Sequence, residues 1–179
     1  GIHKCEFEQL SDAEPFYQQF PQLRRQKLIL FLGRIDPKKG LALLSSAFAR
    51  VHEAFPDTHL VVAGPDSIGF MPTAQGYFEE VGCLDAVTFT GMLSGPVKYA
   101  ALAAADLYVS PSYSEGFSMS VLEGMAAGLP CVITENCNFP EAEDAKAAYV
   151  VKTNADCIGD ALLACCQNSN EARQTGQIE

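Results

Sequence analysis

The sequence lacks long hydrophobic runs, a surplus of basic residues and any internal repeat. No stretch of the 179 residues approaches the roughly 18 consecutive apolar residues of a membrane-spanning helix. Lys and Arg number 12 against 22 Asp and Glu, a formal net charge of −10, so no basic face for nucleic acid is expected. A repeat period of roughly 20–50 residues is also missing, which excludes solenoids and propellers. Since 48% of the residues are hydrophobic, we expect one folded globular domain.

The seven cysteines include no C-x-x-C pair, and the sequence has no N-x-S/T glycosylation site. A chain of this length does not need disulfides to fold, and an odd number of cysteines would leave one unpaired. No signal peptide opens the chain. We therefore expect a reducing, cytoplasmic compartment. Because the first residue is Gly1 and not methionine, we also expect a piece of a longer protein.

Apolar runs alternate with segments of helical periodicity. Residues 28–32 form a continuous apolar run, typical of a strand buried on both faces, and apolar residues recur at helical spacing between 41 and 55. We expect further strands over 60–63, 87–90, 107–109, 131–133 and 149–151, and helices around 77–81, 97–104, 121–127 and 158–166. This order predicts an α/β fold with a parallel sheet covered on both faces, in which ligands bind at the carboxyl ends of the strands.

The two ends of the chain are less regular. Residues 1–27 have no sustained period and are interpreted as a linker segment that leads into the domain of residues 28–168. Residues 169–179 are polar and are expected to be a frayed tail.

The segment that follows the first expected strand, residues 33–40, is rich in cations. These are Arg34, Lys38 and Lys39. One interpretation is a helix start, with Asp36 as N-cap and Pro37 at the first helical position. The other is an anion site, because lysines at a helix N-terminus cost about a few tenths of a kcal/mol each and an anion would reverse that cost. The segment alone does not decide between the two.

The segment after the fourth expected strand, residues 110–125, combines a glycine, a helix start and two carboxylates. Gly116 and the N–H groups of the helix start suit a phosphate, whereas Glu115 and Glu123 suit hydroxyl groups. A ligand with phosphates in its middle and hydroxyls at both ends is a nucleotide sugar. The alternatives are a capping box of Ser120 with Glu123 and a solvated loop carboxylate at Glu115.

Together the two segments resemble the donor-binding domain of the family 4 (group 1) retaining glycosyltransferases, which have the GT-B fold. The resemblance rests on Gly33-Arg34 with Lys39-Gly40, and on the frame E-G-F-S-x-x-x-L-E-x-M-A-x-G-L-P that begins at Glu115. Other residues match the family in the same order along the chain: Gly64, Phe89-x-Gly91-x-Leu93, Ala105-Asp106 and Pro140-Glu141. The resemblance implies a Rossmann-like, three-layer α/β/α domain with a parallel sheet of about six strands, one half of a GT-B fold.

The resemblance also implies roles for individual residues. Arg34 and Lys39 would hold the donor diphosphate and stabilise the charge that develops on it, and Glu115 would face the transferred sugar as a third catalytic residue. The other implied contacts are those of Gly116, Phe117 and Ser118 with the diphosphate, of Gly116 and Phe117 with the sugar, of Glu123 with the ribose, and of Leu93 and Lys98 with the base. No metal or other cofactor is expected, and the sequence contains no D-x-D motif.

The implied reaction moves a hexosyl group from a UDP-, GDP- or ADP-sugar to an acceptor held by an N-terminal domain. Nothing in residues 1–27 corresponds to that domain, so we expect a fragment that binds a donor but transfers poorly. The sequence argues against a dinucleotide-binding oxidoreductase and a P-loop hydrolase, because neither G-x-G-x-x-G after an expected strand nor G-x-x-x-x-G-K-[ST] occurs. A non-catalytic nucleotide-sugar-binding module and another GT-B enzyme, such as an epimerase or a phosphorylase, remain alternatives.

Overall fold

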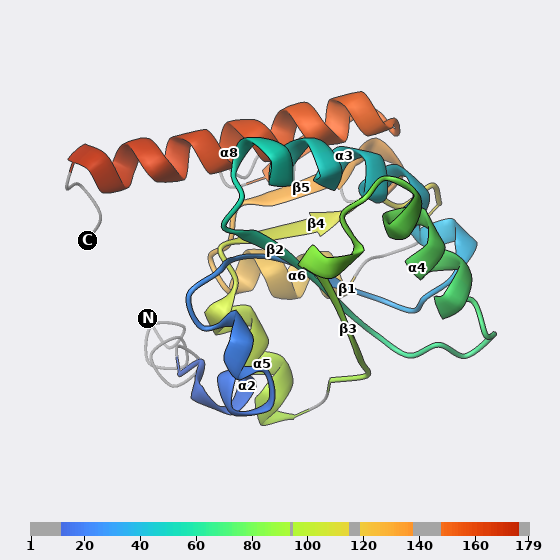
Figure 1. The fold of residues 1–179 in the computed structure, drawn as a ribbon, viewed down its shortest axis with the longest axis horizontal. Coiled ribbons are helices and arrows are strands. Elements are labelled where there is room, and N and C mark those ends of the chain that lie inside the picture. The colour runs from blue at the N-terminus through green and yellow to red at the C-terminus, as the bar shows by residue number, and fades with distance from the viewer. Residues whose placement is uncertain (1–11, 94, 115–118, 138–147, 176–179) are drawn as a thin grey trace.

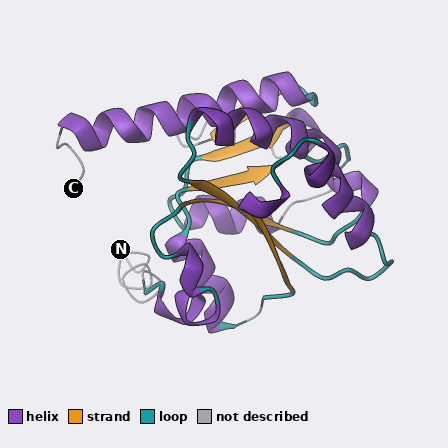
Figure 2. Cartoon of the chain, viewed as in Figure 1, coloured by secondary structure: helices purple, strands orange, loops and turns teal. Residues whose placement is uncertain are grey.

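The computed structural model describes residues 12–93, 95–114, 119–137 and 148–175. They form a six-stranded parallel sheet in the order β3-β2-β1-β4-β5-β6, with helices on both faces (Figures 1 and 2). The strands are β1 (Lys27–Leu32), β2 (Thr58–Ala63), β3 (Val87–Gly91), β4 (Leu107–Ser110), β5 (Cys131–Thr134) and β6 (Ala148–Val151). The α-helices are α2 (Glu14–Gln19), α3 (Leu41–Ala54), α4 (Met71–Glu80), α5 (Pro96–Ala104), α6 (Met119–Ala126) and α8 (Ala155–Thr175). The prediction of a Rossmann-like three-layer α/β/α domain is confirmed.

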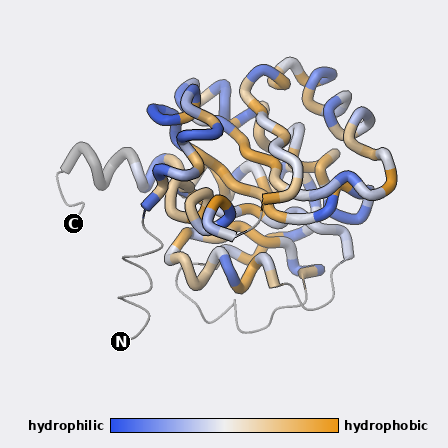
Figure 3. Tube along the Cα trace, turned by 90° about the horizontal axis from the view of Figure 1, so that it is seen from below, coloured by the Kyte–Doolittle hydropathy of each residue, from blue (hydrophilic) through white to orange (hydrophobic). Residues whose placement is uncertain are grey.

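The strand β1 lies in the middle of the sheet, and all six of its residues are buried. Its odd-numbered positions Ile29 and Phe31 face the core under α3, α4 and α8. Its even-numbered positions, from Leu28 to Leu32, face the core under α2, α5 and α6. Figure 3 shows this apolar centre between the more polar outer helices. A strand that must be apolar on both faces has no alternation, which is why it was visible as one continuous run.

Residues 12–26 are part of the domain and not a separate linker. The helix α2 and the short 3-10 helix η1 (Pro21–Leu23) bury Phe16 and Leu23 to 1% exposure in the same core as α5. The expectation of an irregular segment up to residue 27 is therefore wrong for this part. The segment is too short to show helical periodicity, and it packs against the core through two buried apolar side chains, Phe16 and Leu23.

Two helices are longer than expected. The helix α4 begins at Met71 and not near residue 77, and it buries Ala74 and Phe78. The helix α8 continues to Thr175, so residues 169–175 are helical and not a frayed tail. Its polar sequence beyond Cys166 carries no apolar period that would have indicated a helix. Among the described residues, no helix combines the length and apolarity needed to cross a bilayer.

Candidate functional site

The cationic segment after β1 lies against the segment after β4. Asp36 caps the 3-10 helix η2 (Pro37–Lys39), and its Oδ1 accepts a hydrogen bond from the Lys38 N–H at 2.9 Å. The Lys38 carbonyl in turn accepts from the Tyr113 N–H at 2.8 Å. The predicted N-cap at Asp36 thus exists but belongs to η2, since α3 begins only at Leu41. The two segments that the sequence singled out are joined by a backbone hydrogen bond.

Gly40 makes this contact possible. Its φ is +79°, in the left-handed region, and a Cβ there would lie 1.9 Å from the carbonyl oxygen of Pro111. A side chain at this position would force the two segments apart. The glycine thus fixes the separation between the cations and the segment after β4.

The two cations assigned to the diphosphate differ in exposure. The Arg34 side chain is 68% exposed, and its Nε lies 3.9 Å from Asp36 Oδ2. The Asp36 side chain is 17% exposed, but the guanidinium is in solvent and the separation is long, so the pair contributes only about 0–1 kcal/mol and a ligand phosphate can compete for Arg34. Lys39 is half-buried, with its Cδ beside Gly33. Both residues stand on the segment that leaves the carboxyl end of β1.

A pocket of about 230 Å³ opens at the carboxyl ends of β1, β2 and β3, beside the starts of α5 and α6. Its lining residues are Leu32, Gly33, Ala63, Gly64, Pro65, Met92, Leu93, Lys98, Met119, Ser120 and Glu123. The strand ends meet closely here, because a Cβ on Gly64 would lie 1.6 Å from the Gly33 carbonyl oxygen. Backbone atoms therefore form the floor of the pocket, and a ligand can approach them without meeting a side chain.

Glu123 and Lys98 form an ion pair on the wall of this pocket. Lys98 Nζ lies 2.6 Å from Glu123 Oε2, and the two side chains are 31% and 25% exposed. The helix α6 begins at Met119, so Ser120 lies inside it and not at its N-cap. The capping-box alternative is therefore not supported. The carboxylate of Glu123 faces the pocket and not the end of its own helix.

The place of α6 is set by its contact with β4. Tyr108 is completely buried, and its hydroxyl donates to the Leu32 carbonyl at 3.4 Å and interacts with the Ser120 side chain. Burial raises the pKa of Tyr108, so the hydroxyl stays protonated and remains a donor. A Cβ on Gly124 would lie 2.8 Å from the Tyr108 ring, which shows how closely the helix sits on the strand. Glu123 precedes Gly124 in the chain, so this close contact determines where Glu123 lies.

The sequence-predicted site residues fall into three groups. Leu93, Lys98 and Glu123 line one pocket, as a shared site requires. Arg34 and Lys39 stand on the adjoining segment after Gly33 but do not themselves line the pocket. The predictions for Glu115, Gly116, Phe117 and Ser118 lie outside the described residues. The sequence analysis did not select two exposed methionines that line the pocket. Their positions, just after β3 and at the start of α6, could have indicated that they lie at the carboxyl edge of the sheet. They are Met92 and Met119, 72% and 60% exposed.

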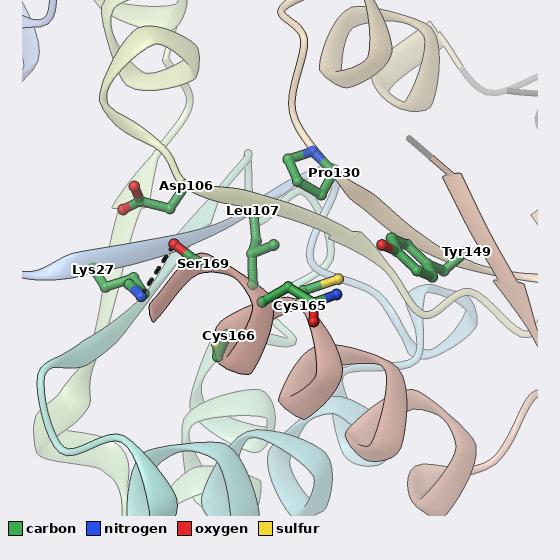
Figure 4. Close-up of a pocket in the computed structure, with 9 residues that line it drawn as sticks. Lys27, Asp106, Leu107, Pro130, Tyr149, Cys165, Cys166 and Ser169 are labelled. Atoms are coloured by element: carbon green, nitrogen blue, oxygen red, sulfur yellow. Dashed lines mark hydrogen bonds between the residues drawn. The ribbon is translucent and has the colours of Figure 1, made fainter. Parts of the chain in front are cut away.

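A larger cavity, of about 310 Å³, lies at the opposite edge of the sheet, beneath the starts of β1 and β4 and along α8 (Figure 4). Lys27 Nζ donates there to Ser169 Oγ at 3.3 Å. Burial raises the pKa of the Cys165 and Cys166 thiols to about 11, so both are protonated at neutral pH and neither is an activated nucleophile. Parallel α/β sheets bind ligands at the carboxyl ends of their strands, and we place the candidate site there despite its smaller volume.

The sequence profile of the family "Glycosyl transferases group 1" matches residues 14–178. Phosphatidyl-myo-inositol mannosyltransferase of Mycobacterium leprae is 32% identical over 156 residues, which are 83% of this chain and 40% of the relative. The chain thus spans well under half of that relative's length.

The solved structures that share the fold include two glycosyltransferases of known description. WaaG, a glycosyltransferase involved in lipopolysaccharide biosynthesis, has a TM-score of 0.77 and 25% identity, with 88% of this chain and 42% of that chain covered. The C-terminal domain of the group 1 family protein LpcC from Francisella tularensis has a TM-score of 0.73 and 24% identity, with 89% of each chain covered. Because the family profile spans nearly the whole sequence and the GT-B enzymes share its fold, this chain belongs to the group 1 glycosyltransferases.

Proposed function

We propose that this chain is the donor-binding half of a retaining, metal-independent glycosyltransferase. The parent protein would move a sugar from a nucleoside diphosphate sugar to an acceptor held by its N-terminal domain. One observation carries the proposal: a cationic segment and a pocket with a carboxylate adjoin each other at the carboxyl edge of the sheet. The match to an isolated C-terminal domain of the family supports the assignment to the C-terminal half.

The cations would serve the diphosphate. When the glycosidic bond breaks, negative charge grows on the leaving diphosphate, and positive groups fixed beside it stabilise the transition state more than the ground state. Arg34 and Lys39 stand on a segment whose backbone is held by Asp36 and by the contact with Tyr113. This is the charge stabilisation that a metal ion would otherwise supply.

The pocket would take the nucleoside. Leu93 offers an apolar surface for the base, and Glu123 offers a carboxylate to the ribose hydroxyls. The motif assigns Glu115, which lies outside the described residues, to the transferred sugar. The acceptor would approach from the side of the N-terminal domain, which would also exclude water.

Calorimetric titration of this chain with UDP, GDP and ADP in the presence of EDTA tests the proposal. We expect weak binding of at least one nucleotide, with the same affinity when Mg²⁺ replaces EDTA. Arg34→Ala and Lys39→Ala should each weaken binding by about tenfold or more, because each removes a charge-assisted hydrogen bond.

The matched control is Arg25→Ala, which removes an exposed cation before β1 and should leave the affinity unchanged. Thermal unfolding of the three variants should differ little from the parent chain, since the replaced side chains are exposed or half-buried. Failure of all three nucleotides to bind, or binding that requires the metal, would contradict the proposal.

A further inference from the structure

The Lys98–Glu123 ion pair joins two helices across the wall of the pocket. Lys98 stands in the first turn of α5 and Glu123 in α6. The helix α5 is anchored by Ala100 and Ala101, which are 2% and 1% exposed, and α6 is anchored on Tyr108. Because both helices are packed closely against the core, the pair has a defined geometry. Its N–O distance of 2.6 Å is that of a short charge-assisted hydrogen bond.

The pair presents an acceptor and a donor side by side. Lys98 occupies Oε2 of Glu123, which leaves Oε1 for a ligand as far as the described residues show. An ammonium has three N–H donors, so Lys98 can donate to Glu123 and also to a ligand oxygen. Two neighbouring hydroxyl groups fit this arrangement, one donating to the carboxylate and the other accepting from the ammonium.

A nucleotide carries one such vicinal diol, the 2′- and 3′-hydroxyls of ribose. We propose that Lys98 positions Glu123 and that the pair selects ribose over 2′-deoxyribose in the donor nucleotide. This inference rests on the proposed function, because it assumes that a nucleoside diphosphate occupies the pocket. It gives Lys98 a role that the resemblance does not imply, since the resemblance assigns this residue to the base.

The position of the pair in the pocket favours this role. Leu93 and Lys98 line the same pocket as Gly33, which leads directly to the cationic segment. A nucleotide whose diphosphate lies against that segment and whose base lies on Leu93 has its ribose between the two. The pair is also more than two-thirds shielded from solvent at each side chain, so a lost hydrogen bond there is not fully replaced by water.

The experiment compares each nucleoside diphosphate with its 2′-deoxy analogue by calorimetry on this chain. UDP, GDP and ADP are screened first, and the tightest binder is taken forward with its 2′-deoxy form. We expect the deoxy form to bind about 10-fold to 100-fold more weakly, the effect of one lost hydrogen bond to a charged group. Lys98→Met should weaken binding of the ribonucleotide by about tenfold or more and reduce the ribose preference to less than about threefold.

Three further variants separate positioning from other roles. Lys98→Arg keeps a donor for Glu123 and should retain most of the ribose preference, whereas Glu123→Gln should lose it. The double variant of Lys98→Met with Glu123→Gln should bind as weakly as the worse single variant, because the two residues act as one unit. Lys152→Met, an exposed lysine after β6, is the control and should change nothing. Thermal unfolding verifies that each variant is folded.

The outcomes distinguish this inference from the proposed function. If none of the nucleotides binds, the proposed function fails and this inference fails with it. If a nucleotide binds but its deoxy form binds equally well, only this inference is overturned. It is also overturned if Lys98→Met weakens both forms equally, since Lys98 would then act on the base or the phosphates.

Discussion

At Gly64 the backbones of two neighbouring strand ends come into contact. The Gly64 N–H donates to the Gly91 carbonyl at 2.9 Å, and the Gly33 N–H donates to the Ala63 carbonyl at 2.9 Å. A methyl group on Gly64 would meet backbone and not a flexible side chain, so the strand ends would have to separate. This residue therefore determines the floor of the pocket.

We predict that Gly64→Ala lowers the free energy of unfolding by about 1–3 kcal/mol, the usual cost of an overpacked position. The same substitution should also weaken nucleotide binding, because the pocket floor moves. Urea unfolding and calorimetry measure the two effects. The control is Gly76→Ala in α4, where a Cβ meets nothing within 4 Å. It should raise stability by about 0.5–1 kcal/mol through helix propensity, and equal effects of the two substitutions would contradict the prediction.

At the scale of elements, α8 is held to α3 by two kinds of contact. Arg50 of α3 donates from Nη2 to Asp160 Oδ1 at 2.8 Å and from Nη1 to the Asp156 carbonyl at 3.3 Å. These groups are largely exposed, at 41% for Arg50 and 70% for Asp160. Ile158 and Leu162, by contrast, are completely buried in the core under α3. The apolar contact should dominate, since exposed ion pairs contribute about 0–1 kcal/mol.

We predict that Leu162→Ala lowers the free energy of unfolding by about 2–5 kcal/mol, the transfer and cavity cost of a buried leucine. Arg50→Ala should cost less than about 1 kcal/mol. Urea unfolding of both variants compares the two contacts directly. A larger loss for the arginine would show that the ion pair, and not the core, attaches α8. Neither residue touches the pocket at the carboxyl edge, so nucleotide affinity should be unchanged wherever the variant is folded.

At the scale of the whole molecule, the pH dependence of stability includes a contribution from His59 on β2. Burial lowers the pKa of His59 to about 4 from 6.5, with His52 adding to the shift and Asp85 opposing it. Its Nε2 lies 2.7 Å from Thr88 Oγ1 of β3. The unfolded chain takes up this proton at a higher pH than the folded one. The contribution of His59 to the free energy of unfolding is therefore complete above about pH 6.5, and it is lost as the pH falls toward about 4.

We predict that His59→Gln reduces this pH dependence. The melting temperature of the parent chain should fall more between pH 7.5 and pH 4.5 than that of the variant, by about 2–4 °C, a modest amount because His59 is only partly shielded. Thermal unfolding of both proteins at the two pH values gives the difference. The comparison cancels the titration of the carboxylates, which both proteins share. Parallel pH profiles would show that His59 is already hydrated in the folded state.

The secondary structure was predictable wherever burial imposed a pattern. The run of β1 and the spacing of α3 were visible because each must supply apolar side chains at fixed intervals. The helix α2 and the last turns of α8 were not, because the first is short and the second carries no apolar period after Cys166. The packing of α2 depends on Phe16, which is buried in the same core as residues of α5 far along the chain.

The sequence by itself determined the order of βαβ units, and with it the edge of the sheet where the motif residues gather. In a sheet of parallel strands all carboxyl ends lie at the same edge, whatever the order of the strands. Only the tertiary structure decided which side chains touch there. The Lys98–Glu123 pair and the close contact of Gly64 with Gly33 join residues far apart in the chain. No local pattern specifies such contacts, because they follow from how α5, α6 and the strand ends pack against the common core.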